Sequence, residues 1–194
     1  MTLPTKLTLL RILLTFFIMG ALFVPGWGAK AVALGGFVVA GITDWLDGYL
    51  ARRWQQTSAL GALLDPIADK VLVLGVFLAF VQLRLIPAWM VLIIALREFV
   101  ITGVRLLAAG RQIILPAAKE GKHKTVSQLL TIFVILLVLL VQECAGPGAM
   151  SQQMRAALQE LILGCLWTTM LLTVSSGTVF FWRHRAILKD VVSR

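Results

Sequence analysis

Four aspartates gather in one apolar stretch of the chain, and they are the residues best suited to carry chemistry. They are Asp44, Asp47, Asp65 and Asp69, among nine acidic residues in the whole sequence. A carboxylate at the centre of a bilayer costs roughly 2.5–3.5 kcal/mol on insertion scales, so an unpaired cluster would be strongly unfavourable. Because hard divalent cations take carboxylate oxygens as ligands, we expect metal at these four positions.

The spacing of the four aspartates indicates how they could meet. Asp44 and Asp47 are three residues apart, and Asp65 and Asp69 are four residues apart. On helices, each pair projects from one face, so two neighbouring helices would direct four carboxylates to one point. This arrangement suits two metal ions about 3.5–4 Å apart, a clamp used in phosphoryl transfer. A purely structural cluster of ion pairs is the alternative.

Small and basic residues accompany the aspartates. Gly48 and Gly61 remove side chains where a ligand or a neighbouring backbone must come close. Arg52 adds a positive fork that matches phosphate oxygens. Pro66 indicates that Asp65 lies at a helix start or at a kink, because proline is tolerated only in the first turn of a helix.

Composition places the chain among membrane proteins. The 194 residues are 59% hydrophobic and 14% charged, with a mean hydropathy of +0.92. A net charge of +9 would suggest nucleic acid as the partner of a soluble protein. Here most basic residues flank apolar runs, so membrane orientation and anionic lipid are the better interpretation, and we expect no nucleic-acid partner.

Six apolar segments predict an all-α, polytopic membrane protein with six transmembrane helices. Each is near the roughly 20 residues needed to cross a bilayer, and irregular backbone cannot face lipid. We expect a single domain over residues 1–194. The predicted helices span 8–25, 31–52, 62–82, 87–109, 125–143 and 154–182.

The basic residues predict the topology. Most of the 18 lysines and arginines fall on one side of the predicted spans, and only Lys30, Arg84 and Arg155 fall on the other. The positive-inside rule then places both termini in the cytoplasm. The aspartates would lie near the cytoplasmic face, in a cavity open to the cytosol.

A signal peptide is the competing interpretation of the first apolar run. Lys6 and Arg11 lie in its basic start, and Ala29-Lys30-Ala31 is similar to a cleavage site with small residues. We favour a membrane helix, because Arg11 interrupts the apolar run.

The acidic stretch resembles the signature of the CDP-alcohol phosphotransferase family at all eight fixed positions. The matching residues are Asp44-x2-Asp47-Gly48-x2-Ala51-Arg52-x8-Gly61-x3-Asp65-x3-Asp69. The resemblance implies six transmembrane helices and a site for two divalent cations, Mg²⁺ or Mn²⁺. It implies that all four aspartates are metal ligands and that Asp69 is also the catalytic base. It further implies that Gly48, Arg52 and Gly61 help to hold the CDP moiety.

Three further stretches carry the resemblance. Pro4-Thr5-Lys6-Leu7-Thr8-x2-Arg11 resembles the family's Pro-Asn-x-Leu-Thr-x-x-Arg element, with Thr5 in place of the commoner Asn and with Thr8 as an implied CDP contact. The other two resemble one branch, the phosphatidylglycerophosphate synthases. They read Arg97-Glu98-x6-Arg105 and Gly121-Lys122-His123-Lys124-Thr125-x2-Gln128.

Basic residues after the aspartates predict an acceptor site. Arg97 lies within an apolar segment beside Glu98 and needs a partner or a polar cavity. Arg105 follows eight residues later on nearly the same face, and Lys122 and Lys124 open the next helix, whose dipole favours an anion. Together they could bind the phosphate of a small phosphorylated alcohol. Alternatively, the two lysines only follow the positive-inside rule.

Two histidines and one glutamate receive structural interpretations. We expect Glu98 to be the partner of an arginine and not a catalyst. We expect His123 to be solvated or at the interface, and His184 to lie in a solvated or lipid-facing basic end.

The resemblance implies transfer of the phosphatidyl group from CDP-diacylglycerol to sn-glycerol 3-phosphate, giving phosphatidylglycerophosphate and CMP. It also implies a homodimer in the inner membrane, with the active site facing the cytoplasm. Within the family, the acceptor could instead be an inositol phosphate, serine or phosphatidylglycerol. From another class, a divalent-cation transporter is the alternative, because acidic clusters in membranes also mark ion paths.

Overall fold

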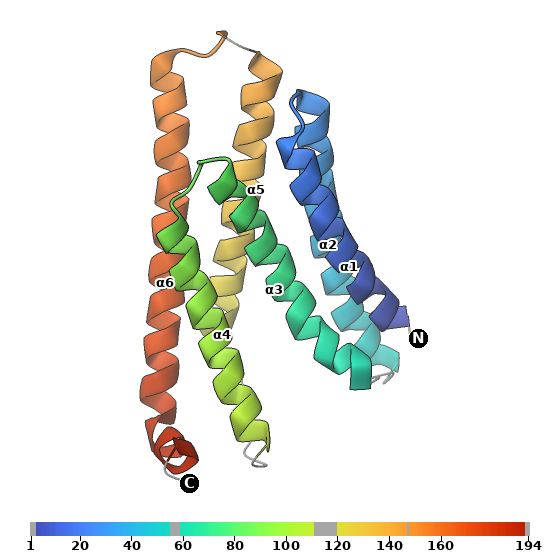
Figure 1. Cartoon of the computed structure of the whole chain (residues 1–194), viewed down its shortest axis with the longest axis vertical. Coiled ribbons are helices and arrows are strands. Elements are labelled where there is room, and N and C mark those ends of the chain that lie inside the picture. Colours follow the sequence, from blue (N-terminus) through green and yellow to red (C-terminus); the bar gives the residue numbers. More distant parts are fainter. Residues whose placement is uncertain (1–2, 55–58, 111–119, 147, 193–194) are drawn as a thin grey trace. The chain divides into compact units, whose positions relative to one another are not determined.

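The structure is a computed structural model that describes residues 3–54, 59–110, 120–146 and 148–192. Within these ranges, the side chains of residues 3–5, 7, 45, 47–54, 59–66, 120–122 and 186–192 are not described. Over the described residues the fold is all-α, as predicted (Figure 1). Its helices are α1 (Leu3–Phe23), α2 (Trp27–Trp54), α3 (Ala59–Gln82), α4 (Ala88–Gly110), α5 (Glu120–Ala145) and α6 (Gln152–Val192).

Each predicted apolar segment corresponds to one helix, but several helices are longer than predicted. Helix α1 begins at Leu3 instead of 8, and α6 ends at Val192 instead of 182. Hydropathy marks only the apolar part of a helix, whereas residues such as Lys6 and Arg185 continue the backbone hydrogen bonds beyond it. Pro4 is tolerated because it lies in the first turn of α1. Helix α3 begins at Ala59, so Pro66 lies inside the helix. Of the two predicted alternatives for Asp65, the helix start is wrong and the kink stays a prediction.

The link after α3 is closed by an unusual C-cap. Arg84 has a φ of 58°, a left-handed conformation that glycine usually supplies. The amide of Leu85 donates to the carbonyl of Phe80 at 3.0 Å, and the amide of Arg84 donates to that of Val81 at 2.9 Å. These are the two hydrogen bonds of a Schellman motif, which satisfies carbonyls at the helix end. Pro87 follows and prevents the helix from continuing.

The chain divides into two compact units. The first contains Met1–Ile86 and Ile132–Glu160, and the second contains Pro87–Thr131 and Leu161–Arg194. The division falls after the α3 cap and within α5 and α6. The prediction of a single domain over 1–194 stays a prediction.

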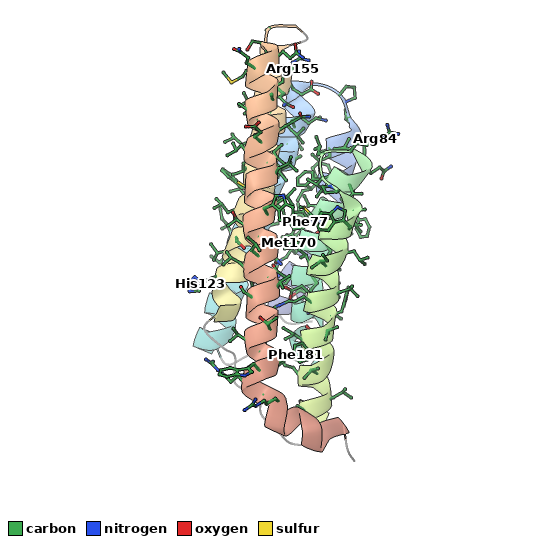
Figure 2. The ribbon with its side chains drawn as sticks, turned by 90° about the vertical axis from the view of Figure 1, so that its left-hand side faces the viewer. Phe77, Arg84, His123, Arg155, Met170 and Phe181 are labelled. Carbon is green, nitrogen blue, oxygen red and sulfur yellow. The ribbon has the colours of Figure 1, made fainter. Side chains whose placement is uncertain are left out.

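In the first unit, α1 packs against both α2 and α3 (Figure 1). The buried core includes Ile18 and Leu22 of α1 and Phe77 of α3, which is labelled in Figure 2. Two glycines permit close packing. A Cβ on Gly36 would lie 3.1 Å from Cγ1 of Ile18, and one on Gly75 would lie 2.9 Å from Cγ2 of Thr15. The backbones of α2 and α3 can therefore approach α1 closely.

Lys30 of α2 fixes the end of α1. It is buried, and its Nζ donates to the carbonyl of Leu22 at 2.6 Å and to that of Val24 at 2.9 Å. A cation at this place satisfies carbonyls left open at the helix C-terminus and interacts favourably with the helix dipole. Lys30, which the sequence placed on the non-cytoplasmic side, thus stabilises the C-terminal end of α1.

The second unit joins α4 to the part of α5 up to Thr131 and to the part of α6 from Leu161. Trp89 of α4 and Trp167 of α6 form an edge-to-face pair with ring centroids 5.9 Å apart. The hydroxyls of Thr131 and Thr169, both buried, lie 2.8 Å apart and join α5 to α6. Apolar and polar contacts therefore both hold α6 in this unit.

Two segments of the described chain are long and apolar enough to cross a membrane, namely His123–Ala145 and Gln152–Arg185. Thr8–Phe23 is a shorter apolar helix. The prediction of six spans with both termini in the cytoplasm stays a prediction.

We predict opposite effects of two glycine substitutions on stability. Gly75→Ala should lower the midpoint of thermal unfolding in detergent, because its Cβ would clash with Thr15, whose hydroxyl is bound to the carbonyl of Arg11 at 2.9 Å. Gly35→Ala is the matched control. No atom lies within 4 Å of a Cβ built there, so it should keep the helix-propensity gain of up to about 1 kcal/mol. Equal stabilisation by both changes would contradict the packing of α1 on α3.

Candidate active site

Arg11 joins two of the four predicted aspartates. Its Nη1 lies 2.7 Å from Oδ1 of Asp44 on α2 and 2.6 Å from Oδ1 of Asp69 on α3. The Arg11 side chain is 1% exposed, whereas those of Asp44 and Asp69 are 50% and 57% exposed. One buried guanidinium on α1 therefore draws two accessible carboxylates from different helices to a single point.

The sequence around Arg11 builds a polar face on an otherwise apolar helix. Thr8 and Thr15 lie three residues before and four residues after Arg11, and both are buried. Thr8, the implied CDP contact, therefore lies on the same face as Arg11. In the sequence, Arg11 stands out only as part of a motif and as a basic residue beside an apolar run. The missed signal was a lone cation inside an apolar run, which requires an anionic partner.

Among the residues that the structure describes, no group of three or more His, Cys, Asp or Glu side chains comes together as a metal site. Asp44 and Asp69 could supply two of the carboxylate ligands of a divalent cation. Oδ1 of Asp44 and Oδ1 of Asp69 both contact the same cationic nitrogen, so the two helices already direct carboxylate oxygens to one positive centre. Oxygen donors of this kind are the ligands that Mg²⁺ and Mn²⁺ prefer. Both carboxylates are also half exposed, so an ion from solvent can reach them.

The other residues of the acidic signature lie outside the described side chains. Asp47, Gly48 and Arg52 are in α2, and Gly61 and Asp65 are in α3. The helical backbone keeps the spacing that the sequence analysis assumed. The meeting of all four carboxylates, and the CDP contacts of the two glycines and Arg52, stay predictions.

In the second unit, Glu98 gathers two of the four predicted phosphate-binding residues. Its Oε1 accepts hydrogen bonds from the Lys124 ammonium, from Nη1 of Arg97 at 3.3 Å and from Nε2 of Gln128 at 3.4 Å. Glu98 and Arg97 belong to α4, and Lys124 and Gln128 belong to α5. The interpretation of Glu98 as the structural partner of an arginine is confirmed, and Lys124 is a second partner.

Helix α6 holds Arg97 from the other side. Nη2 of Arg97 donates to Oγ of Ser176 at 2.7 Å. A Cβ on Gly177 would lie 3.3 Å from Cγ of Arg97, so the glycine leaves room for the arginine stem. Sequence reasoning missed both residues, because a Ser-Gly pair in an apolar helix carries no signal of which side chain it faces.

Arg105, the third predicted phosphate ligand, has an aromatic neighbour. Arg105 lies on α4, and its guanidinium carbon is 5.5 Å from the ring centroid of Phe180. Its Nε is buried and has no hydrogen-bond partner among the described residues. The side chain of Lys122 lies outside the part of the chain that is described.

The two histidines differ. His123 is exposed, as predicted, and its side chain projects outward from α5 (Figure 2). The prediction of a solvated or lipid-facing His184 is wrong. It is 4% exposed, and its Nδ1 lies 2.9 Å from the carbonyl of Phe180. The helix places His184 one turn after Phe180, so the ring packs there, with centroids 4.7 Å apart.

Comparison with known proteins gives a consistent match. The family model described as CDP-alcohol phosphatidyltransferase matches residues 1–175. The CDP-diacylglycerol–glycerol-3-phosphate 3-phosphatidyltransferase of Bacillus subtilis strain 168 is 37% identical over 200 residues, covering 96% of this chain and 97% of its own. The protein of the same name from Pectobacterium atrosepticum is 39% identical over 138 residues, covering 69% of this chain and 75% of its own.

The matched region contains α1 to α5 and most of α6, and it includes both the Arg11–aspartate cluster and the Glu98 cluster. The chain therefore belongs to the CDP-alcohol phosphatidyltransferase family.

Proposed function

We propose that this chain transfers the phosphatidyl group from CDP-diacylglycerol to sn-glycerol 3-phosphate, giving phosphatidylglycerophosphate and CMP. The observation that carries the proposal is the similarity to the CDP-diacylglycerol–glycerol-3-phosphate 3-phosphatidyltransferase of Bacillus subtilis. That protein is 37% identical over nearly the whole of both chains. The site chemistry agrees with it. One unit presents carboxylates to a cation, and the other presents an arginine and a lysine suited to a phosphate.

In this proposal, Asp44, Asp47, Asp65 and Asp69 hold two divalent cations, Mg²⁺ or Mn²⁺. When bound, these ions supply neutralisation of the diphosphate charge and of the charge that develops on departing CMP. The observation in its favour is that Asp44 and Asp69 already share one positive group.

The residues of the chain have distinct tasks in the reaction. Asp69 takes the proton of the acceptor hydroxyl, and the resulting oxygen attacks the phosphorus that carries diacylglycerol. The bond from that phosphorus to the CMP oxygen breaks, and CMP leaves with the electron pair. Thr8, Gly48, Arg52 and Gly61 hold the CDP moiety, and Arg97, Arg105, Lys122 and Lys124 bind the acceptor phosphate. Catalysis is thus mostly orientation and charge stabilisation.

A membrane location is part of the same proposal. Large apolar side chains are exposed on several helices, including Leu13 and Phe16 on α1, Leu106 and Leu107 on α4, and Trp182 on α6. Exposed apolar surface of this extent is unfavourable in water and favourable in lipid. We infer six spans in the inner membrane, with the active site facing the cytoplasm, and a homodimer as the family resemblance implies.

The first test is acceptor identity. Purified protein with CDP-diacylglycerol and Mg²⁺ should release CMP with glycerol 3-phosphate, and much more slowly with inositol phosphate, serine or phosphatidylglycerol. The reason is that a site with Arg97 and Lys124 favours a phosphorylated alcohol. Release of CMP with none of these acceptors, together with metal flux into liposomes without nucleotide, would instead favour a divalent-cation transporter.

The second test concerns the base. Asp69→Asn should lower the rate of CMP release by about 10²-fold or more, because an amide cannot take a proton. Its Oδ1 can still accept from Arg11, so the variant should remain folded in detergent. Asp190→Asn makes the same chemical change outside the acidic signature and should leave the rate within about twofold of wild type. Full activity of Asp69→Asn would remove Asp69 as the base.

The third test removes the metal. Treatment with EDTA should abolish CMP release, because four carboxylates would then face the diphosphate without neutralising charge. Added Mg²⁺ or Mn²⁺ in excess of the chelator should restore the rate, and EDTA already saturated with Mg²⁺ is the control. An unchanged rate in EDTA, with metal absent by elemental analysis, would contradict the metal site.

A further inference from the structure

One oxygen of Glu98 is the meeting point of three donors. The Lys124 ammonium, Nη1 of Arg97 and Nε2 of Gln128 all donate to Oε1 of Glu98, and they come from two helices. This is the arrangement expected around an oxygen of a bound anion. The site therefore already orients its donors toward negative charge, with the carboxylate of the protein itself at the centre.

The Glu98 carboxylate also offsets the repulsion between the Arg97 and Lys124 cations. The side chains of Arg97, Glu98 and Lys124 are only 11%, 15% and 10% exposed. Two cations this close repel each other, and the repulsion is stronger away from water. Lysine and arginine side chains are long and flexible, so without a shared partner they would separate. Glu98 keeps them together.

Two nitrogens of the Arg97 guanidinium are bound within the cluster, whereas its Nε has no partner among the described residues. Nη1 binds Glu98 and Nη2 binds Ser176, while Gly177 leaves space for the stem. Oγ of Ser176 in turn donates to the carbonyl of Thr173 at 3.0 Å, which fixes the serine. Nε of Arg97 is buried and has no hydrogen-bond partner among the described residues. A buried donor without a partner is unfavourable, and an anion oxygen could satisfy it.

We propose that Glu98 is a positioning residue for the acceptor site. Glu98 holds Arg97 and Lys124 together as a preformed phosphate-binding pair, and the Ser176 hydroxyl holds the Arg97 guanidinium from the other side. This inference rests on the proposed function, because it takes the phosphate of glycerol 3-phosphate as the ligand. Glu98 acts through its neighbours and does not touch the reacting atoms. The cluster keeps one cation in excess of its carboxylate, so it retains attraction for a phosphate.

The test compares the two substrates in one set of variants. Glu98→Ala should raise KM for glycerol 3-phosphate roughly tenfold, the equivalent of one lost charge-assisted hydrogen bond. The KM for CDP-diacylglycerol and kcat should change less than about twofold. Glu98→Gln keeps an oxygen that accepts from the same donors but loses the charge that offsets the two cations, so it should recover only part of the loss. Glu160→Ala, at an exposed glutamate of α6, is the control and should match wild type.

Two variants keep the test decisive. Ser176→Ala removes the hydroxyl that accepts from Arg97. It should raise the KM for glycerol 3-phosphate several-fold and leave the KM for CDP-diacylglycerol unchanged. If Glu98→Ala does not fold in detergent, Glu98→Asp takes its place. It keeps the charge but is one methylene shorter, so its oxygen no longer reaches all three donors, and the same rise in KM is expected.

A second measurement does not depend on turnover. Glycerol 3-phosphate and inorganic phosphate should each raise the thermal unfolding midpoint of the wild-type protein, and Glu98→Ala should lose this shift. If the wild type gives the shift but no CMP release, the proposed function fails while the positioning role stands. An equal loss for both substrates, an unchanged KM for glycerol 3-phosphate, or a fall in that KM would each overturn the positioning role.

Discussion

A buried guanidinium bound to two carboxylates is the interaction on which the first unit depends. Arg11 is almost fully buried, and a buried charge without a partner is strongly destabilising. Its partners must come from α2 and α3, so those two helices have to place Asp44 and Asp69 beside α1. Gly36 and Gly75 permit this by letting the three backbones approach closely. Core packing and the acidic site are thus consequences of the same constraint.

In the second unit, buried charges are also paired across helices, but here one carboxylate is shared by two cations. There a single carboxylate, Glu98, serves two cations, Arg97 and Lys124. Among the described residues, the Arg11 cluster has one carboxylate in excess, and the Glu98 cluster has one cation in excess. The first balance suits the divalent cations proposed for that cluster, and the second suits the phosphate proposed for the other. The residual charge of each cluster thus agrees with the part of the reaction proposed for it.

Much of the fold could be predicted because hydropathy and the acidic signature are local in the sequence. The apolar segments gave the helices, and the spacing of the signature indicated the family before any tertiary contact was known. The incorrect predictions also came from reading short stretches of sequence by themselves. His184 lies in a basic run that predicts a solvated side chain, but its ring is buried against the ring of Phe180, and its Nδ1 lies close to the Phe180 carbonyl. Pro66 indicated a helix start or a kink, and the helix start is excluded because α3 begins at Ala59.

The sequence by itself determined the helices, the apolar surface, the family and the residue types at both clusters. Only the tertiary structure decided which charges meet. Arg11 is 58 residues from Asp69, and Glu98 is 26 residues from Lys124. Whether such pairs form depends on how each helix is rotated about its axis and on how closely its neighbours can approach. Those properties arise from packing along whole helix faces, including Gly177 and Ser176, which no short motif records.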